Sequence, residues 1–188
     1  MESRQLYRVK EEDLPRLEKL LTGCFEHDPL YCKLIPDEEI RKRLLPELFA
    51  CDLTEFYETC EIYSDSPEMN SLLVVSDETE PYNPLTYYLA EALCETVLSG
   101  EYTVLESYKG KFLIKEDPSL KTLWKFMLGK DYLNSRWTAQ LHQTERIHII
   151  YLAVRPEMQH HGLAALLLGE VIRYADQHKL MISLETHN

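Results

Sequence analysis

The stretch from Ile147 to Tyr174 limits the possible folds more than any other part of the chain. Its first eight residues, 147–154, are almost continuously apolar and rich in β-branched side chains, as in a strand buried on both faces. Pro156 cannot donate to a β-ladder and disfavours helix at the residue before it, so the strand is predicted to end there. From Leu163 the apolar residues recur at helical spacing. The stretch therefore predicts a buried strand, a short turn and an amphipathic helix.

The turn between that strand and helix, residues 159–164, reads QHHGLA. The first N–H groups of a helix lack partners inside the helix, and the helix dipole adds positive potential there. A glycine lets the backbone come close to a ligand, so such a turn can hold a phosphate or pyrophosphate. An ordinary strand-to-helix connection has the same outline, and the spacing alone does not choose between the two.

The residues themselves carry a resemblance. Leu152-Ala153-Val154-x-Pro156, followed by Gln159-x-x-Gly162-x-Ala164, resembles motif A of the GNAT superfamily, the acyl-CoA-dependent N-acetyltransferases. That family's pattern is Gln or Arg, two residues, Gly, one residue, then Gly or Ala. The resemblance extends to residues 181–188, which look like the next strand of the family. It implies an α/β fold, a mixed and mostly antiparallel sheet with one central parallel pair, flanked by helices.

The resemblance also implies acetyl-CoA as the acyl donor. The turn amides would surround its pyrophosphate, and residues 152–154 would pair with the pantetheine arm like an added strand. The N–H of Leu152 or Val154 would polarise the thioester carbonyl. The family often has Gly or a basic residue where this chain has two histidines, and a protonated His161 would contact phosphate. The residues implied to bind the donor are Leu152, Ala153, Val154, Gln159, His160, His161, Gly162, Leu163, Ala164, Ala165 and Asn188.

Acetyl transfer to an amine also needs a base for the amine and an acid for the leaving thiolate. The base candidates are His142, Glu145, His148 and Glu185, of which Glu145 and Glu185 are our predicted catalytic residues; a water chain is the alternative. Glu185 is a carboxylate in an apolar strand and needs a partner or a role. Glu145 and His148 are three residues apart, so they would face opposite sides of a regular strand. The acid in the family is commonly a tyrosine on a later helix, and it stays unassigned.

Charge and composition argue against several other classes. The net charge of −12, from 20 basic and 32 acidic residues, repels phosphate backbones and disfavours nucleic-acid binding. It favours a cationic acceptor, such as an amine. No apolar run is long enough for a membrane span, and the first residues do not resemble a signal peptide. A cytoplasmic protein without a membrane partner is therefore expected.

Motifs of other chemistries do not occur. The five scattered cysteines include no C-x-x-C pair, which favours reduced thiols. The sequence contains no G-x-G-x-x-G, no G-K-[ST] and no G-x-S-x-G, which disfavours dinucleotide folds, P-loops and serine hydrolases. It contains no H-E-x-x-H, and the adjacent pair His160-His161 would rarely converge on one ion, so no metal site is predicted.

The 188 residues suit one domain, 1–188. A first strand is predicted within 4–10 and a helix over 14–25 capped by Asp13; a further helix follows Asp37 and is either kinked or divided at Pro46. A hairpin is predicted from 60–64 and 71–76. Four aromatic residues would line the acceptor site or, as is more common, pack in the core. They are Phe25, Phe49, Phe56 and Tyr57.

Residues 78–141 read as a helical insertion before the 147–154 strand, with helical spacing over 84–98 and 102–114 and a helix start at Asp117-Pro118. The insertion is either a lid over the acceptor or extra cover, including a dimer contact. The sequence ends at Asn188, before the helix and strands that usually complete this family's fold, so we expect a truncated chain or completion of the sheet by a partner, as in a homodimer.

The sequence thus predicts an N-acetyltransferase that moves acetyl directly from acetyl-CoA to a primary amine of a small molecule. The alternative is a truncated or degenerate GNAT-like domain that acts as a non-catalytic interaction or ligand-binding module.

Overall fold

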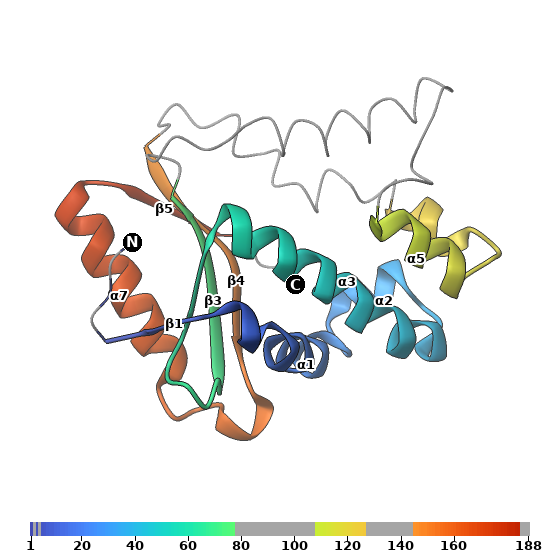
Figure 1. Ribbon diagram of the computed structural model, residues 1–188, viewed down its shortest axis with the longest axis horizontal. Helices are drawn as coiled ribbons and strands as arrows, with labels where there is room; N and C mark the ends of the chain where they lie inside the picture. The colour runs from blue at the N-terminus through green and yellow to red at the C-terminus, as the bar shows by residue number, and fades with distance from the viewer. Residues whose placement is uncertain (2, 4, 78–107, 127–144, 185–188) are drawn as a thin grey trace.

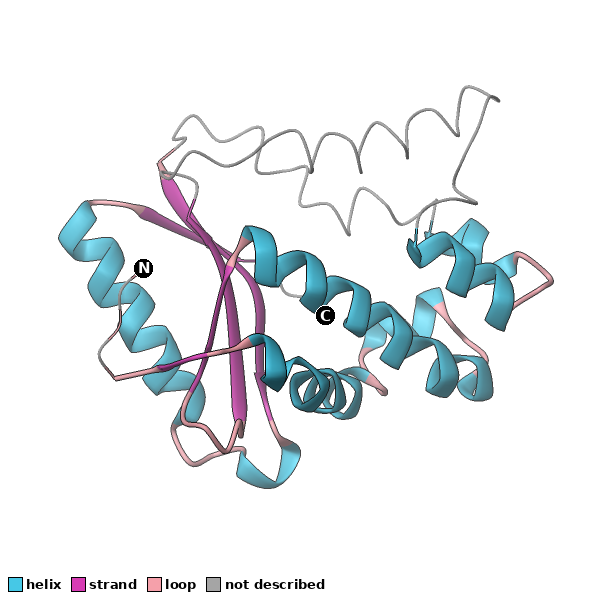
Figure 2. Cartoon of the chain, viewed as in Figure 1, coloured by secondary structure: helices cyan, strands magenta, loops and turns pink. Residues whose placement is uncertain are grey.

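The computed structural model describes residues 1, 3, 5–77, 108–126 and 145–184 (Figure 1). Within these ranges a five-stranded mixed sheet carries helices on both faces (Figure 2), as the sequence predicted. The strands are β1 (Tyr7–Arg8), β2 (Glu61–Ser64), β3 (Ser71–Asp77), β4 (Arg146–Val154) and β5 (Met181–Leu184). The helices are α1 (Leu14–Phe25), α2 (Pro29–Leu34), α3 (Glu38–Thr59), α5 (Tyr108–Glu116) and α7 (Leu163–His178), with 3-10 turns η1 (Glu11–Asp13) and η3 (Pro156–Met158).

The strands follow the order β1-β2-β3-β4-β5 across the sheet. The first three pairings are antiparallel, and β4 and β5 are parallel. The predicted hairpin and the predicted parallel pair are therefore confirmed. Within the described sheet, however, the parallel pair lies at one edge and not in the middle. Helix α7 is the crossover that parallel strands require.

A β-bulge interrupts β4 near its middle. Tyr151 pairs with Val74 and Ile149 pairs with Val75, so Ile150 has no opposite residue on β3. A bulge shifts the alternation of side chains along a strand. As a result, Ile150 and Tyr151 both pack on the side of α1 and α3, whereas Ile149 and Leu152 pack on the side of α7.

The sheet separates two apolar cores, and Figure 1 shows the helices that lie on its two sides. On one face α1, α2 and α3 cover the sheet, and Leu17, Leu21 and Phe49 are fully buried there. On the other face α7 covers β3 and β4 with Leu167 and Val171. Because helices lie on both sides, β4 is apolar on both faces, as its sequence predicted.

One of the helix starts described here agrees with the sequence, and two differ. Asp37 accepts a hydrogen bond from the N–H of Ile40 (2.9 Å) at the start of α3, which runs through Pro46 as a single helix. Asp13 does not cap α1; its carboxylate accepts from the N–H of Lys10, because η1 precedes the helix. Helix α2 was not predicted, although Asp28 caps it and Pro29 opens it.

Within the 78–141 insertion, the described residues form a second layer of helix on α3. Arg43 of α3 pairs with Glu116 of α5 (2.8 Å between Nε and Oε2). Asp117 accepts from the N–H groups of Ser119 (3.1 Å) and Thr122 (2.9 Å), and residues 121–126 are helical, close to the helix start predicted there. The helix predicted over 84–98 lies outside the described residues.

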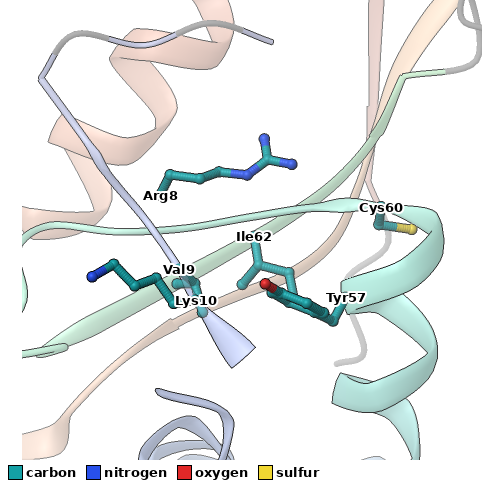
Figure 3. Close-up of a pocket in the computed structure, with 6 residues that line it drawn as sticks. All are labelled: Arg8, Val9, Lys10, Tyr57, Cys60 and Ile62. Atoms are coloured by element: carbon teal, nitrogen blue, oxygen red, sulfur yellow. The ribbon is translucent and has the colours of Figure 1, made fainter. Parts of the chain in front are cut away.

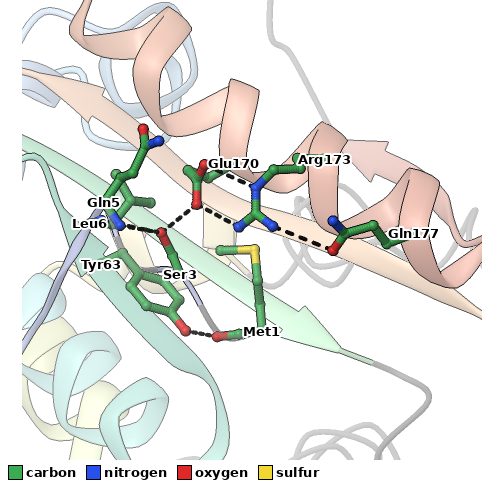
Figure 4. A network of polar contacts seen from close by, with 8 residues as sticks. All are labelled: Met1, Ser3, Gln5, Leu6, Tyr63, Glu170, Arg173 and Gln177. Carbon is green, nitrogen blue, oxygen red and sulfur yellow. Dashed lines mark hydrogen bonds and ion pairs between the residues drawn. The ribbon is translucent and has the colours of Figure 1, made fainter.

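The N-terminal segment packs against α7 (Figure 4). The Ser3 hydroxyl donates to Glu170 (2.5 Å), which also accepts from Nε and Nη2 of Arg173 (3.1 and 2.8 Å). Tyr63 donates to the carbonyl oxygen of Met1. These bonds fasten the start of the chain to the outer side of the sheet and satisfy the buried Glu170 carboxylate.

Candidate functional site

Among the described residues, the end of β4 has an open backbone edge. Strand β5 pairs with β4 only from Arg146 to Ile149, so within the described ranges residues 150–154 have a strand neighbour on the β3 side alone. The N–H of Arg155 donates to the carbonyl of Asn70 on the β3 side (2.9 Å). Since alternate residues of a strand direct their backbone groups to opposite edges, those of Leu152 and Val154 point away from β3, toward the open edge.

The start of α7 presents further backbone donors. Gly162 stands at its N-cap with φ of +82°, a left-handed conformation that glycine adopts without strain. No side chain caps this end of α7, and the first bond of the helix runs from the N–H of Leu166 to the carbonyl of Gly162 (2.9 Å). The first amides of the helix, with the positive end of its dipole, form an anion-binding arrangement.

The two histidines of the turn lie on the surface. His160 also has a positive φ, +65°. The turn therefore accommodates a bulky side chain at a position where the family often has Gly or a basic residue. The ring Nδ1 of His161 lies 2.8 Å from the carbonyl oxygen of Gln159, so Nδ1 carries the hydrogen and donates. His160, His161 and Gly162 are all exposed and free of burying neighbours that would plug the turn.

The open edge and the turn are contiguous. The short turn η3 leads from β4 to residues 159–162, and the Gln159 amide donates back to the Val154 carbonyl (3.5 Å). The Cys24 thiol, from α1, donates to the same carbonyl (3.3 Å). A strand edge that runs directly to an uncapped helix start can bind an extended ligand ending in phosphates.

An aromatic cluster covers the other side of β4. The Tyr151 ring has its centroid 5.7 Å from that of Phe25, 6.1 Å from Phe49 and 5.9 Å from Phe56. Its hydroxyl lies 3.2 Å from that of Tyr31 and donates to the Asp52 carboxylate (3.1 Å). Burial, together with the Asp52 charge, raises the pKa of Tyr151 well above its usual value, so its phenol stays protonated.

The fourth predicted aromatic residue is elsewhere. Tyr57 is 39% exposed and lines a surface hollow of about 500 Å³ with Arg8, Lys10, Cys60 and others (Figure 3). Arg8 there is paired with Glu61 (2.7 Å). None of the residues predicted to bind the donor lines this hollow, so it is not an extension of the β4 edge.

The predicted base candidates are spread along the sheet. Glu145 is exposed and directly precedes β4; the seven residue steps from it to Leu152 span ~20 Å of strand. His148 is buried, with Nδ1 2.9 Å from the Ser183 hydroxyl of β5. His142, Glu185 and Asn188 lie outside the described residues. Glu145 and Glu185 therefore stay predictions, and Glu145 would reach an amine at Leu152 only through intervening groups.

The described ranges contain neither a metal centre nor a helix that could span a membrane. There, no three His, Cys, Asp or Glu side chains are placed to hold a metal ion. No helix of that part of the chain combines the length and the apolar character needed to cross a bilayer.

Known proteins resemble this chain in sequence and in fold. Residues 126–188 match the family model described as "Acetyltransferase (GNAT) family". A crystal structure from Corynebacterium glutamicum, described as histone acetyltransferase HPA2 and related acetyltransferase, has 15% sequence identity and a TM-score of 0.52; the similarity covers 91% of this chain and 71% of that one. An agmatine N-acetyltransferase mutant in its apo form has 15% identity and a TM-score of 0.46, over 97% and 75% of the two chains. No curated protein sequence matches the chain.

Proposed function

We propose that this chain, whose residues 126–188 match the GNAT acetyltransferase family model, is a member of that superfamily and transfers an acetyl group from acetyl-CoA to a primary amine of a small molecule. One observation carries the proposal: the open edge of β4 at Leu152 and Val154 runs directly to the uncapped start of α7. A thioester on a long arm with two amides and a diphosphate has the matching shape and chemistry.

The donor would lie along this edge. The backbone groups of Leu152 and Val154 would pair with the amides of the pantetheine arm, as a strand pairs with its neighbour. The N–H groups of residues 162–165 would bind the diphosphate, aided by the dipole of the 16-residue helix α7. The positive end of the helix dipole would offset the repulsion between the diphosphate and a protein with a net charge of −12.

The backbone would also assist the chemistry. The Leu152 N–H would donate to the thioester oxygen as negative charge develops there, which typically contributes ~3 kcal/mol or more to transition-state stabilisation. The aromatic cluster behind Tyr151 would keep water from that side. With both substrates held together, direct transfer requires no acyl-enzyme intermediate. Glu145 and Glu185 are the bases that the sequence predicted, and Asn188 is a predicted contact to the arm.

The acceptor would be cationic before it reacts. The acidic surface attracts ammonium groups and repels nucleic acid. The Asp52 carboxylate adds a negative charge within the aromatic cluster that faces the end of β4. Both features favour a small amine over an anionic acceptor.

Calorimetry with acetyl-CoA tests donor binding, and release of free thiol with a panel of amines tests transfer. The panel consists of n-butylamine, putrescine, phenethylamine, lysine and kanamycin. We expect micromolar binding and amine-dependent thiol release. Failure to bind acetyl-CoA would refute the proposal, whereas binding without thiol release for any amine would favour a non-catalytic ligand-binding module.

A matched pair of variants locates the donor. Gly162→Glu places a side chain and a negative charge at the start of α7, and we expect it to abolish acetyl-CoA binding. Gly169→Glu adds the same charge on an exposed position of the same helix, seven residues further along, and should retain the affinity. Equal affinities in the two variants would place the diphosphate elsewhere.

A further inference from the structure

The buried hydroxyl chain behind β4 has a geometry suited to proton transfer. We propose that Tyr151 passes the proton that an acceptor ammonium must lose to the carboxylate of Asp52, and that Tyr31 positions Tyr151 for this step. The inference rests on the proposed acetyl transfer and adds a route for its first proton.

The donor and acceptor roles along this row of hydrogen bonds follow from the positions of the hydroxyl hydrogens. A carboxylate only accepts, so Tyr151 donates its one hydrogen to Asp52 across 3.1 Å. Tyr31, 3.2 Å away, must then be the donor to the Tyr151 oxygen. The Tyr151 oxygen has a second lone pair, which can accept from an ammonium. The order Tyr31, Tyr151, Asp52 therefore ends on the group that can hold a proton.

The bulge in β4 places these hydrogen-bonded side chains beside the open edge. Because Ile150 is the extra residue, Tyr151 turns its ring toward α2 and α3, while the N–H of the next residue, Leu152, points to the open edge. The relay and the proposed carbonyl polariser are thus consecutive residues of one strand. Neither Glu145, ~20 Å further along the strand, nor the exposed turn histidines have this position.

The groups around Tyr151 are suited to attract the acceptor's ammonium group and then to take its proton. Asp52 is 8% exposed and Tyr31 is 7% exposed, with the Phe25, Phe49 and Tyr151 rings packed around Tyr31. Aromatic faces attract cations, and a carboxylate removed from water attracts them more strongly. The titratable groups that face Tyr151 are Tyr31 from α2 and Asp52 from α3, and Asp28 is the next charge beyond Tyr31.

The step balances as follows. The ammonium gives one proton to the Tyr151 oxygen as Tyr151 gives its own to Asp52, which leaves a neutral amine and a carboxylic acid. The amine nitrogen then forms the C–N bond to the acetyl carbon as the C–S bond breaks. The second nitrogen proton goes, through water, to the departing thiolate. Asp52 returns its proton to solvent before the next turnover.

Two nucleophiles separate a relay from a structural role. The panel amine that is acetylated fastest arrives as an ammonium, whereas hydroxylamine is largely neutral at neutral pH and has no such proton to lose. We expect Tyr151→Phe to lower kcat by about 100-fold with the ammonium, the range of general base catalysis, and by a few-fold only with hydroxylamine. Asp52→Asn should reproduce this difference, and acetyl-CoA affinity should stay unchanged in both variants.

The chain offers a control for the lost hydroxyl. Tyr7 donates to Asp13 (2.8 Å), another tyrosine–carboxylate bond, at the first strand of the sheet. Tyr7→Phe should leave both rates unchanged. Thermal unfolding of each variant shows that the compared proteins are folded.

Equal losses with both nucleophiles, or no loss in either variant, would overturn the relay and leave the bonds as core structure. A wild-type protein that binds acetyl-CoA yet acetylates no panel amine would also overturn the relay, since Tyr151 would then have no ammonium from which to accept a proton. Failure to bind acetyl-CoA is a different result, because it refutes the proposed function itself.

Discussion

The Cys24 thiol of α1 donates to the Val154 carbonyl oxygen at the end of β4, with 3.3 Å between sulfur and oxygen. The two residues are 130 positions apart in sequence. This bond fixes the end of α1 against the edge along which the pantetheine arm would lie. Cys24 is therefore a chemical probe of that edge.

Acetyl-CoA should protect Cys24 from alkylation. Burial raises the pKa of the Cys24 thiol above its usual value, so the thiolate is scarce and iodoacetamide should react slowly at pH 8. A ligand along residues 152–154 should slow the reaction several-fold more. Peptide mass spectrometry measures this, with Cys32 of α2 as the internal control. Equal protection of both thiols would indicate general stabilisation only, and no protection would place the arm elsewhere.

Two glycines of the α7 region should respond to alanine with opposite sign. An added Cβ meets no atom within 4 Å at either Gly162 or Gly169, so sterics do not distinguish them. Gly162 has φ of +82°, and alanine there should lower the free energy of unfolding by ~1–2 kcal/mol. Gly169 is inside α7, where alanine should raise it by ~0.5–1 kcal/mol. Urea unfolding measures both; a stabilising Gly162→Ala would contradict the left-handed turn.

Asp117 should stabilise the fold at neutral pH and not in acid. Bonds from the Ser119 hydroxyl and from Thr122 lower the pKa of Asp117 to about 2, against ~3.9 in an unfolded chain. A carboxylate with a depressed pKa contributes stability above the unfolded value, and loses it as pH falls through the folded value. Asp117→Ala should therefore cost ~1–2 kcal/mol at pH 7 and clearly less at pH 3. A difference that is the same at both pH values would argue against these bonds.

Two glutamates compare a buried ion pair with an exposed one. Glu170 is 5% exposed and accepts from Ser3 and Arg173, so Glu170→Gln should lower the free energy of unfolding by ~1–3 kcal/mol. Glu38 pairs with Lys42 on the surface of α3 (2.7 Å), and Glu38→Gln should leave the free energy of unfolding nearly unchanged. Chemical denaturation distinguishes the two, and similar values for both would mean that the N-terminal segment does not hold Glu170 in solution.

Local sequence patterns predicted much of the fold. The apolar run at 147–154, the stop at Pro156 and the helical spacing after Leu163 predicted β4, the end of β4 and α7, because each depends on residues within a few positions of one another. The cap at Asp37 was predicted for the same reason, whereas the helix predicted to start at Asp117-Pro118 begins at residue 121, after a turn. Asp13 was assigned to the wrong helix start, since its carboxylate turns back to Lys10, and the six-residue α2 was overlooked despite the Asp28-Pro29 pair.

In the candidate site, local sequence patterns predicted only part of the geometry. The sequence indicated residues 152–154 and the turn at Gly162, because motif spacing follows the chain. The resemblance implied a free edge at residues 152–154, but the sequence gave no sign of the bulge at Ile150, which depends on the register with β3. Phe25, Phe49 and Phe56 were placed near the acceptor or in the core, and they pack around Tyr151.

The sequence by itself determined the strand, turn and helix of the candidate donor site, because these depend on residues that are neighbours along the chain. It also determined the acidic character of the surface, because that depends on the sum of the side-chain charges. Only the tertiary structure decided that Tyr31, Asp52 and Tyr151, on α2, α3 and β4, share one line of hydrogen bonds. Residues 99 and 120 positions apart come within hydrogen-bond distance only when α2 and α3 have packed against β4, and local sequence patterns do not show such long-range contacts.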